Sequence, residues 1–245
     1  MAKKNLIFGI HAVMEAVKEG KDIEKVFAVP NINSYQKKEL VWLLNSLRIP
    51  VSFVPVEKLN AISGKNHQGV IAYVSPVTYQ ILEDLVPTWF EQGKMPVVLL
   101  LDQVSDVRNF GAIARTAGCA GVDAIVIPMK GSAQINEEAV KTSSGALFSI
   151  PICRVNKLSE TIVFLKDSGF HIIAATEKAE LDYYAIDFSG PIAIILGSED
   201  RGISSGLLPL CEDKVRIPVF GSIGSLNVSV ATGVLVYEIV RQRAK

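Results

Sequence analysis

The sequence predicts an α/β protein in two parts, and three patterns in its 245 residues support this. Residues 95–245 alternate continuous apolar runs, such as residues 96–101 and 191–196, with segments of helical periodicity. Strands that are apolar on both faces are typical of a parallel sheet covered by helices on each side. Residues 1–78 also alternate helix and strand signals. The stretch of residues 75–94, with Pro76, Pro87 and Gly93 within mixed polarity, predicts a linker between the parts, with a short helix around residues 82–85.

The front part is predicted to contain two helices and three strands. Helical periodicity covers residues 11–19 and 35–47, and in the second helix four leucines share one face: Leu40, Leu43, Leu44 and Leu47. Their i, i+3, i+4, i+7 spacing is typical of a helix packed against a core. Runs rich in β-branched residues predict strands at residues 26–29, 51–54 and 69–74.

The rear part is predicted to contain four buried strands and five helices. Apolar runs place the strands at residues 96–101, 124–128, 170–175 and 191–196, and a further short strand begins near Val215. Helical signals cover residues 109–120, 137–148, 158–167, 206–210 and 227–243. No two glycines in the chain are separated by a single residue, so the chain lacks the GxGxxG nucleotide turn. Any cofactor must therefore bind in another way, beyond the carboxyl ends of the strands.

Composition and charge exclude several classes of protein. Hydrophobic residues make up 49% and charged residues 20%, which indicates a folded chain and not a disordered one. The 25 Lys+Arg and 25 Asp+Glu give a net charge of zero, which argues against a strongly basic nucleic-acid sleeve. Residues 1–78 nevertheless carry ten Lys/Arg and six Asp/Glu, for +4, and residues 79–245 carry −4. A basic patch in the front part and a chance scatter of solvated charges both fit that division.

Cysteine and histidine usage argues against a metal or disulfide framework. Cys119, Cys153 and Cys211 are odd in number and widely spaced, and the three histidines are scattered. The longest apolar runs are far shorter than the about 20 residues that cross a bilayer. Glu15 interrupts the N-terminal apolar stretch too early for a signal peptide. We expect no metal, no membrane association and a reduced, cytoplasmic location.

Three polar segments follow predicted strands of the rear part. The first, residues 101–115, leaves a strand through a polar turn and enters a helix at Asn109, a residue type that favours helix N-caps. Arg115 lies six residues later among alanines, and a guanidinium in such a setting is expected to have a specific polar partner. Simple capping for Asn109 and a surface salt bridge for Arg115 are the alternatives.

The second and third segments carry a carboxylate and a group of polar residues. Gly197 ends a predicted strand, and Glu199 follows it near a helix N-terminus, where the helix dipole favours a carboxylate. Ser225 is predicted to be the N-cap of the last helix, in which Asn227 and Ser229 are polar residues among apolar ones. Buried polar side chains need hydrogen-bond partners, and we expect these two to bond either to neighbouring backbone groups or to a ligand.

Together and in this order, NFGAIAR, GSEDRG and SLNVSVATG resemble the three signature motifs of the SpoU/TrmH family of RNA ribose 2′-O-methyltransferases. IFGIHAVMEAV and HQGVIAYV in the front part look like that family's substrate-binding domain, which is related to an RNA-binding ribosomal-protein fold. The resemblance implies this domain at residues 1–78, a linker at 79–94 and a methyltransferase domain at 95–245. It implies the SPOUT fold for the latter, with a parallel sheet and a C-terminal trefoil knot at about residues 194–240.

The resemblance also implies S-adenosylmethionine as cofactor and no metal. By motif position the catalytic set is Asn109, Arg115, Glu199, Ser225 and Asn227. The implied cofactor contacts are Thr176, Leu196, Gly197, Ile217, Ser225, Leu226 and Asn227. A guanidinium, with a pKa above about 12, is a poor base, so Arg115 is expected to bind an RNA phosphate and polarise the 2′-hydroxyl, with Asn109 and Glu199 fixing it. The acceptor of the hydroxyl proton stays open.

Members of this family work as homodimers packed through their knot helices, and the type closest to this chain methylates a guanosine of 23S rRNA. A tRNA substrate, or an RNA-binding protein without catalysis, are the alternatives. The basic front part favours 23S rRNA and indicates Lys37, Lys38 and Lys65 as candidate RNA contacts, although each also fits a solvated face.

Overall fold

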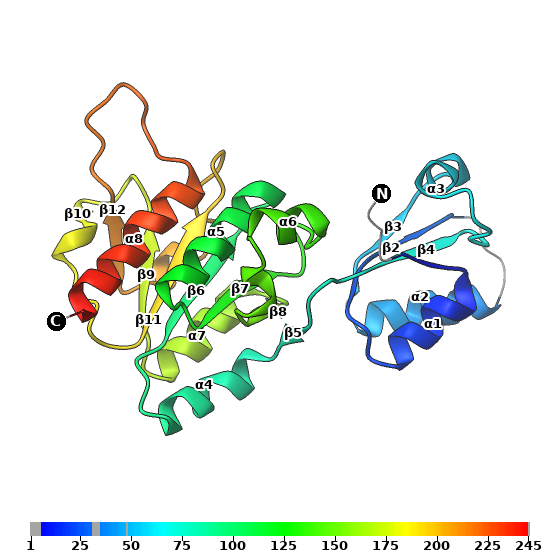
Figure 1. Cartoon of the computed structure of the whole chain (residues 1–245), viewed down its shortest axis with the longest axis horizontal. Helices are drawn as coiled ribbons and strands as arrows, with labels where there is room; N and C mark the ends of the chain where they lie inside the picture. The colour runs from blue at the N-terminus through cyan, green and yellow to red at the C-terminus, as the bar shows by residue number, and fades with distance from the viewer. Residues whose placement is uncertain (1–5, 31–34, 48, 245) are drawn as a thin grey trace. The chain divides into compact units, whose positions relative to one another are not determined.

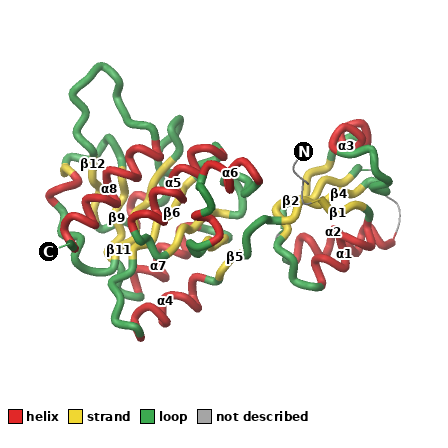
Figure 2. The backbone as a smooth tube through the Cα atoms, in the orientation of Figure 1, coloured by secondary structure: helices red, strands yellow, loops and turns green. Residues whose placement is uncertain are grey.

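The structure is a computed structural model that describes residues 6–30, 35–47 and 49–244. The chain forms two compact units. The front unit runs to Thr78, with residues 135–137 grouped with it, and the rear unit comprises the rest of the chain from Tyr79. Each unit has its own sheet, so each is described by itself (Figures 1 and 2).

The front unit is a four-stranded sheet in the order β1-β4-β2-β3, in which only the β2–β3 pair is parallel. Its elements are β1 (Leu6–Phe8), α1 (Ile10–Lys18), β2 (Ile23–Ala28), α2 (Tyr35–Ser46), β3 (Val51–Phe53), α3 (Val56–Ile62) and β4 (Val70–Val74). Figure 2 shows α1 and α2 on one side of the strands and α3 on the other.

Alternation along β4 accounts for these two covered faces. Val70 and Ala72 pack with the buried residues of α1 and α2, whereas Ile71 packs with Leu59 of α3. The helix predicted at 35–47 is present, but it ends at Ser46, and Leu47 is half-exposed because it lies past the last turn. The short elements β1 and α3 were not predicted.

The rear unit is an eight-stranded sheet in the order β10-β12-β9-β11-β6-β7-β8-β5, and all its neighbours are parallel. The parallel α/β fold predicted from the sequence is therefore confirmed. The strands are β5 (Tyr79–Gln80), β6 (Val97–Asp102), β7 (Ala124–Pro128), β8 (Ile152–Val155), β9 (His171–Ala175), β10 (Leu181–Asp182), β11 (Ile192–Gly197) and β12 (Asp213–Arg216). The α-helices are α4 (Leu82–Glu91), α5 (Val107–Ala120), α6 (Glu137–Thr142), α7 (Leu158–Asp167) and α8 (Val228–Arg243).

Helices cover both faces of this sheet. Buried residues of α4 and α7 pack with Val98 and Leu100 of β6 on one face, while the alternate residues Leu99 and Leu101 are buried on the other. There α5 and α8 lie side by side (Figure 1). Because both faces are dry, polar groups of the central strands gather at the strand ends.

Residues 79–94 differ from the expected linker. Tyr79 and Gln80 pair with β8, and α4 buries Leu82, Val86 and Trp89 in the rear core. These three positions have the i, i+4, i+7 spacing of an amphipathic helix. The short helix predicted around residues 82–85 is present, and it continues past Pro87 to Glu91. The segment is thus the first strand and helix of the rear unit.

Two predicted helices of the rear part are also shorter than expected. The helix predicted at 137–148 stops at Thr142, because Ser144 and Gly145 adopt positive φ angles of 52° and 87° before a 3-10 turn, η1 (Ala146–Phe148). The helix predicted at 206–210 is the single 3-10 turn η3 (Leu208–Leu210), and a third such turn is η2 (Tyr183–Ala185).

Candidate functional site

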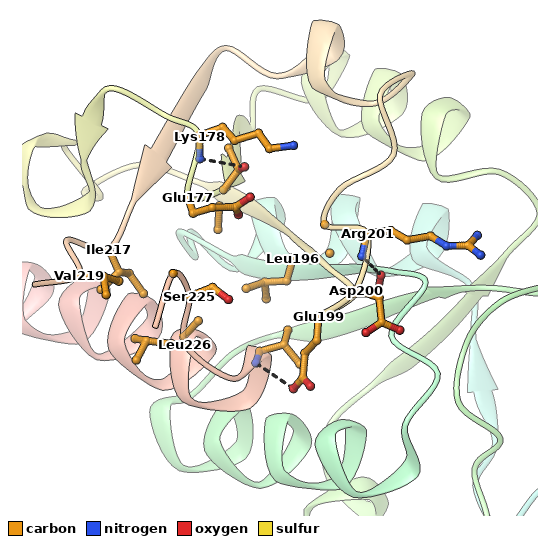
Figure 3. A pocket seen from close by; sticks show the side chains of 18 of the residues that line it. Glu177, Lys178, Leu196, Glu199, Asp200, Arg201, Ile217, Val219, Ser225 and Leu226 are labelled. Atoms are coloured by element: carbon orange, nitrogen blue, oxygen red, sulfur yellow. Dashed lines mark hydrogen bonds between the residues drawn. The ribbon is translucent and has the colours of Figure 1, made fainter. Parts of the chain in front are cut away.

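A cavity of about 370 Å³ lies beyond the carboxyl ends of β9 and β11 in the rear unit. Three segments line it, one after β9, one after β11 and one between β12 and α8 (Figure 3). In open parallel sheets, ligands bind in such crevices at the carboxyl ends of strands. The lining residues are Ala175, Thr176, Glu177, Lys178, Leu196, Gly197, Ser198, Glu199, Asp200, Arg201, Gly202, Val215, Ile217, Val219, Gly224, Ser225, Leu226, Val228 and Ala231.

Gly197 is the point where the loop after β11 folds back on the strand. A Cβ at residue 197 would lie 2.1 Å from the carbonyl carbon of Gly202 and 2.3 Å from the amide nitrogen of Ile203. The Gly202 amide also donates to the Ser198 carbonyl at 2.8 Å, which closes the turn. Any side chain at residue 197 would force this backbone apart, so the turn requires glycine.

The starts of α5 and α8 meet at a network of three side chains from distant segments. The Asn109 Nδ2 donates to Glu199 Oε1 at 2.9 Å, and the Asn227 Nδ2 donates to Asn109 Oδ1 at 3.0 Å. Asn227 also donates to the same oxygen of Glu199. We call Asn109, Glu199 and Asn227 the amide–carboxylate network. It joins α5, the loop after β11 and α8 beside the cavity.

The helix caps explain why these amides are available. Asp106 caps α5 by accepting from the Asn109 backbone amide at 2.8 Å, so the Asn109 side chain is free to reach Glu199. Asn227 caps α8, because its Oδ1 accepts from the Ser229 amide at 3.0 Å. The predicted caps at Asn109 and Ser225 are therefore wrong; each true cap lies close by, where the chain turns from extended to helical backbone.

Glu199 lies where two helix dipoles help to hold its charge. Its Oε1 is 3.4 Å from the backbone amide of Val228 in the first turn of α8, and Asn109 belongs to the first turn of α5. Partial positive charge at helix N-termini stabilises a carboxylate. The Glu199 oxygen that faces the helices is occupied by amide donors, so its part in the site is to hold α5 and α8 in place.

Arg115 lies apart from this network. It is exposed on α5 and makes no hydrogen bond or ion pair within the described ranges. Six residues of helix carry it about 9 Å along the axis from Asn109. Asn109 and Glu199 bind each other and Asn227 and do not bind Arg115, so the partner expected for its guanidinium is not found among the residues that the structure describes.

The cavity gathers most of the residues predicted to bind a cofactor. Six of the seven line it, namely Thr176, Leu196, Gly197, Ile217, Ser225 and Leu226. The seventh, Asn227, follows Leu226 and belongs to the network. Sequence reasoning missed the charged rim, formed by Glu177, Lys178, Asp200 and Arg201, although these residues directly follow β9 and β11 (Figure 3).

Metal ligands and membrane-spanning segments are both absent from the part of the chain that the structure describes. No three His, Cys, Asp or Glu side chains there come together as a metal site, and no helix there is long and apolar enough to cross a bilayer. The three cysteines are free thiols.

Comparison with known proteins gives matches over both units. A family model described as the SpoU rRNA methylase family matches residues 96–237, and one described as RNA 2′-O ribose methyltransferase substrate binding matches residues 6–80. A Staphylococcus saprophyticus protein assigned to the TrmH family of tRNA/rRNA methyltransferases is 38% identical over 238 residues, which are 97% of this chain and 96% of that protein.

Solved structures with the same fold include proteins that hold a cofactor. The SpoU methyltransferase AviRb of Streptomyces viridochromogenes in complex with AdoMet has a TM-score of 0.62 and 26% identity, covering 98% of this chain and 90% of its own. The AdoMet-bound rRNA methyltransferase of Sinorhizobium meliloti has a TM-score of 0.62 and 26% identity, covering 96% of this chain and 86% of its own.

Proposed function

The chain belongs to the SpoU family of RNA methyltransferases, and from that premise we propose that it transfers a methyl group from S-adenosylmethionine to a ribose 2′-hydroxyl of RNA. The substrate we propose is a guanosine of 23S rRNA, methylated in the cytoplasm. The observation that carries the proposal is the amide–carboxylate network closing one side of a cavity built from three separate strand-end segments.

The cavity suits S-adenosylmethionine in size and chemistry. About 370 Å³ lies within the range of small-molecule sites. Leu196, Ile217 and Leu226 offer apolar walls for a flat base, and the rim carboxylates of Glu177 and Asp200 suit a positively charged ligand. S-Adenosylmethionine supplies an electrophilic methyl group on a sulfonium when bound. We propose contacts to it from the six lining residues of the predicted set and from the adjacent Asn227.

Arg115 is the residue that we propose to act on the RNA. Its guanidinium offers hydrogen-bond donors and no acceptor, so it is suited to bind a phosphate and to orient the 2′-hydroxyl for in-line attack, and unsuited to remove a proton. Support comes from its exposure and from its lack of an ion pair within the described residues, which leave its donors available to another molecule. We keep Ser225, at the cavity wall, in the catalytic set.

The amide–carboxylate network has a positioning role in this proposal. Asn109 and Glu199 fix the start of α8 through Asn227, and the residues just before α8, Ser225 and Leu226, form the cavity wall. Holding reacting groups within a fraction of an ångström is worth orders of magnitude in rate.

We also propose the trefoil knot and the homodimer of the family for this chain. The tight fold of Gly202 and Ile203 over Gly197, within the knotted range of about residues 194–240, supports the knot. Exposed apolar side chains on α8 and the loop before it support the dimer: Phe220, Ile223, Val230 and Tyr237. Leu235 and Ile239 of the same helix are buried in the core of the rear unit and so do not belong to this exposed set.

One experiment distinguishes an rRNA methyltransferase, a tRNA methyltransferase and an RNA-binding protein without catalysis. We would map 2′-O-methyl groups on rRNA and tRNA from cells with and without the gene, and expect one 23S rRNA guanosine to lose its methyl group. Loss at a tRNA position instead would identify a tRNA enzyme, and no change at any position would favour an RNA-binding protein without catalysis.

A variant pair tests the role of Arg115 in vitro. Arg115→Ala should reduce single-turnover methyl transfer by about 10²–10³-fold while S-adenosylmethionine affinity changes less than twofold. The control is Arg108→Ala on the same helix, because Arg108 is also exposed but forms an ion pair with Glu138. Equal rates for Arg115→Ala and the parent chain would remove Arg115 from the mechanism.

A further inference from the structure

The sheet face that α3 partly covers in the front unit carries two half-buried aromatic rings. Phe8 of β1 and Phe27 of β2 are both paired with Ile71 of β4, one from each side. Directly paired residues share a face, so the two rings lie on the same side of the sheet, two strands and about 10 Å apart. Leu59 and Ile62 of α3 pack into the same cluster.

Three lysine ammonium groups lie over these rings. Lys25 Nζ is 4.9 Å and Lys58 Nζ is 5.7 Å from the centre of the Phe27 ring, and Lys65 Nζ is 5.3 Å from the centre of the Phe8 ring. The lysines come from β2, from α3 and from the loop after α3, so the fold brings them together. We call Lys25, Lys58 and Lys65 the ring-bound lysines.

The ring-bound lysines carry charges that no carboxylate of the described residues neutralises. None of their ammonium groups forms an ion pair with a carboxylate in the described ranges, unlike Lys21, which pairs with Glu19. A cation–π contact attracts an ammonium group to the ring face and so limits its motion, without using up its hydrogen-bond donors. Less side-chain entropy is then lost when a phosphate binds.

The geometry matches a nucleic-acid backbone better than a base. Lys25 and Lys58 share one ring, so their ammonium groups are at most about 11 Å apart, and phosphates repeat every few ångströms along a strand. Because the lysines stand over the rings, the ring faces are not open for stacking of bases. The surface therefore suits contacts that position RNA without reading its sequence.

Lys37, one of the lysines indicated by the sequence, is unsuited to this task. It is only 7% exposed, and its Nζ lies 2.9 Å from where a Cβ of Gly69 would be. Burial also lowers the pKa of its ammonium group. Lys38 is exposed on α2, on the opposite side of the sheet from the ring-bound lysines.

We infer that the α3-side face of the front sheet is the surface that holds the RNA backbone, with Lys25, Lys58 and Lys65 each neutralising a phosphate. This rests on the proposed function, since it assigns the part of the front unit that binds the substrate RNA. It replaces Lys37 and Lys38 with Lys25 and Lys58 and keeps Lys65.

Matched charge variants of the full chain test this. The face variant is Lys25→Gln, Lys58→Gln and Lys65→Gln together, and the control is Lys18→Gln, Lys21→Gln and Lys38→Gln, which changes net charge equally away from the face. Affinity for a single-stranded oligouridine 30-mer is measured from 50 to 300 mM KCl. We expect the face variant to bind at least about tenfold more weakly, with the slope of log K against log salt reduced by about 2.

The control triple is expected to keep affinity within about twofold and to keep the parent slope. Replacing the same three face lysines by arginine should retain binding, which shows that charge is the cause even if the glutamine variant folds poorly. Unchanged affinity and slope in the face variant, or an equal loss in the control, would overturn the inference.

Measurements other than the oligouridine titration test the proposed function. S-Adenosylmethionine affinity by calorimetry should be the same for the face variant and the parent chain, and methyl transfer to rRNA is measured on the parent chain. If the parent chain methylates no RNA, the proposed function fails, and the oligouridine titration still decides whether the face binds RNA.

Discussion

The two sheets of this protein expose their functional groups in different places. The front sheet is mixed, with α1 and α2 on one face and only the short α3 on the other, so part of a sheet face stays open and carries the ring-bound lysines. The rear sheet is wholly parallel and covered on both faces, so its polar groups lie at the strand ends. The connectivity of the strands therefore decides whether functional groups lie on an open face of the sheet or at the carboxyl ends of its strands.

The comparison also separates two kinds of interaction. The front unit offers lysines that no carboxylate of the described residues pairs with, and their effect falls with salt. The rear unit offers a cavity shaped by backbone and hydrogen bonds. Substitutions in the front unit should therefore leave cofactor affinity unaffected, and substitutions at the cavity of the rear unit should leave RNA affinity unaffected. Four predictions test that separation, in order of decreasing effect.

The largest effect should come from where the chain is cut between the units. A chain that begins at Tyr79 should fold and bind S-adenosylmethionine, because it keeps β5 and α4. A chain that begins at Lys94 loses the buried side chains of Leu82, Val86 and Trp89, so its free energy of unfolding should fall by on the order of 5 kcal/mol. Urea unfolding of both chains measures this. Equal stability of the two would show that α4 is dispensable.

The next effect should come from the turn at the end of β11. Gly197→Val should lower S-adenosylmethionine affinity at least about 100-fold in calorimetry, because its side chain would enter the backbone of Gly202 and Ile203. RNA binding through the front unit should persist. Gly206→Ala is the matched control, since a Cβ there meets nothing within 4 Å. Wild-type cofactor affinity in Gly197→Val would contradict the proposed site.

A smaller effect should come from Asn227. Asn227→Ala removes the cap of α8 and should destabilise the rear unit by about 1 kcal/mol. Asn227→Ser keeps a capping oxygen but lacks the amide that donates to Asn109 and Glu199. We expect thermal melting to be restored in the serine variant and single-turnover methyl transfer to stay slow. Full activity in the serine variant would mean that only the cap matters.

The smallest effect should be the acid sensitivity of α8. Bonds from Arg241 and Gln242 to the Glu238 carboxylate lower its pKa from 4.5 to about 2. A carboxyl group whose pKa is lower in the folded than in the unfolded chain stabilises the fold at pH values above its unfolded pKa. That stabilisation is lost as the pH falls from about 5 to 2. The rear unit's melting temperature should fall over this range, and less so in Glu238→Gln. Identical pH profiles would exclude Glu238 as a contributor.

Sequence patterns predicted the strands and helices of the rear unit better than those of the front unit. The central rear strands are buried on both faces, and such continuous apolar runs are readable without tertiary information, whereas β1 and α3 are too short to show a period. Six of the proposed cofactor contacts line one cavity because carboxyl ends of parallel strands share an edge. The family resemblance contributed their identity.

Side-chain partnerships were beyond such patterns. That Asn109 binds Glu199 and Asn227 depends on how α5 and α8 pack, which no local spacing encodes. Likewise, Lys37 and Lys58 look equally polar in sequence, yet one is buried and the other stands over a ring. A helix buries the side chains on one side and exposes those on the other, so charge counts located the basic unit but not the face that we propose to bind RNA.

The amide–carboxylate network has a consequence for how the chain folds. Two of its three bonds join residues 90 and 118 positions apart in the sequence, and two bonds in the neighbouring loop span 101 and 102 positions. Loops of that length are costly in entropy to close and form slowly. On the ribosome, the network stays incomplete until residues 227–243 have emerged and α8 has docked. A chain that stops short of α8 can pair its strands but cannot close the cavity.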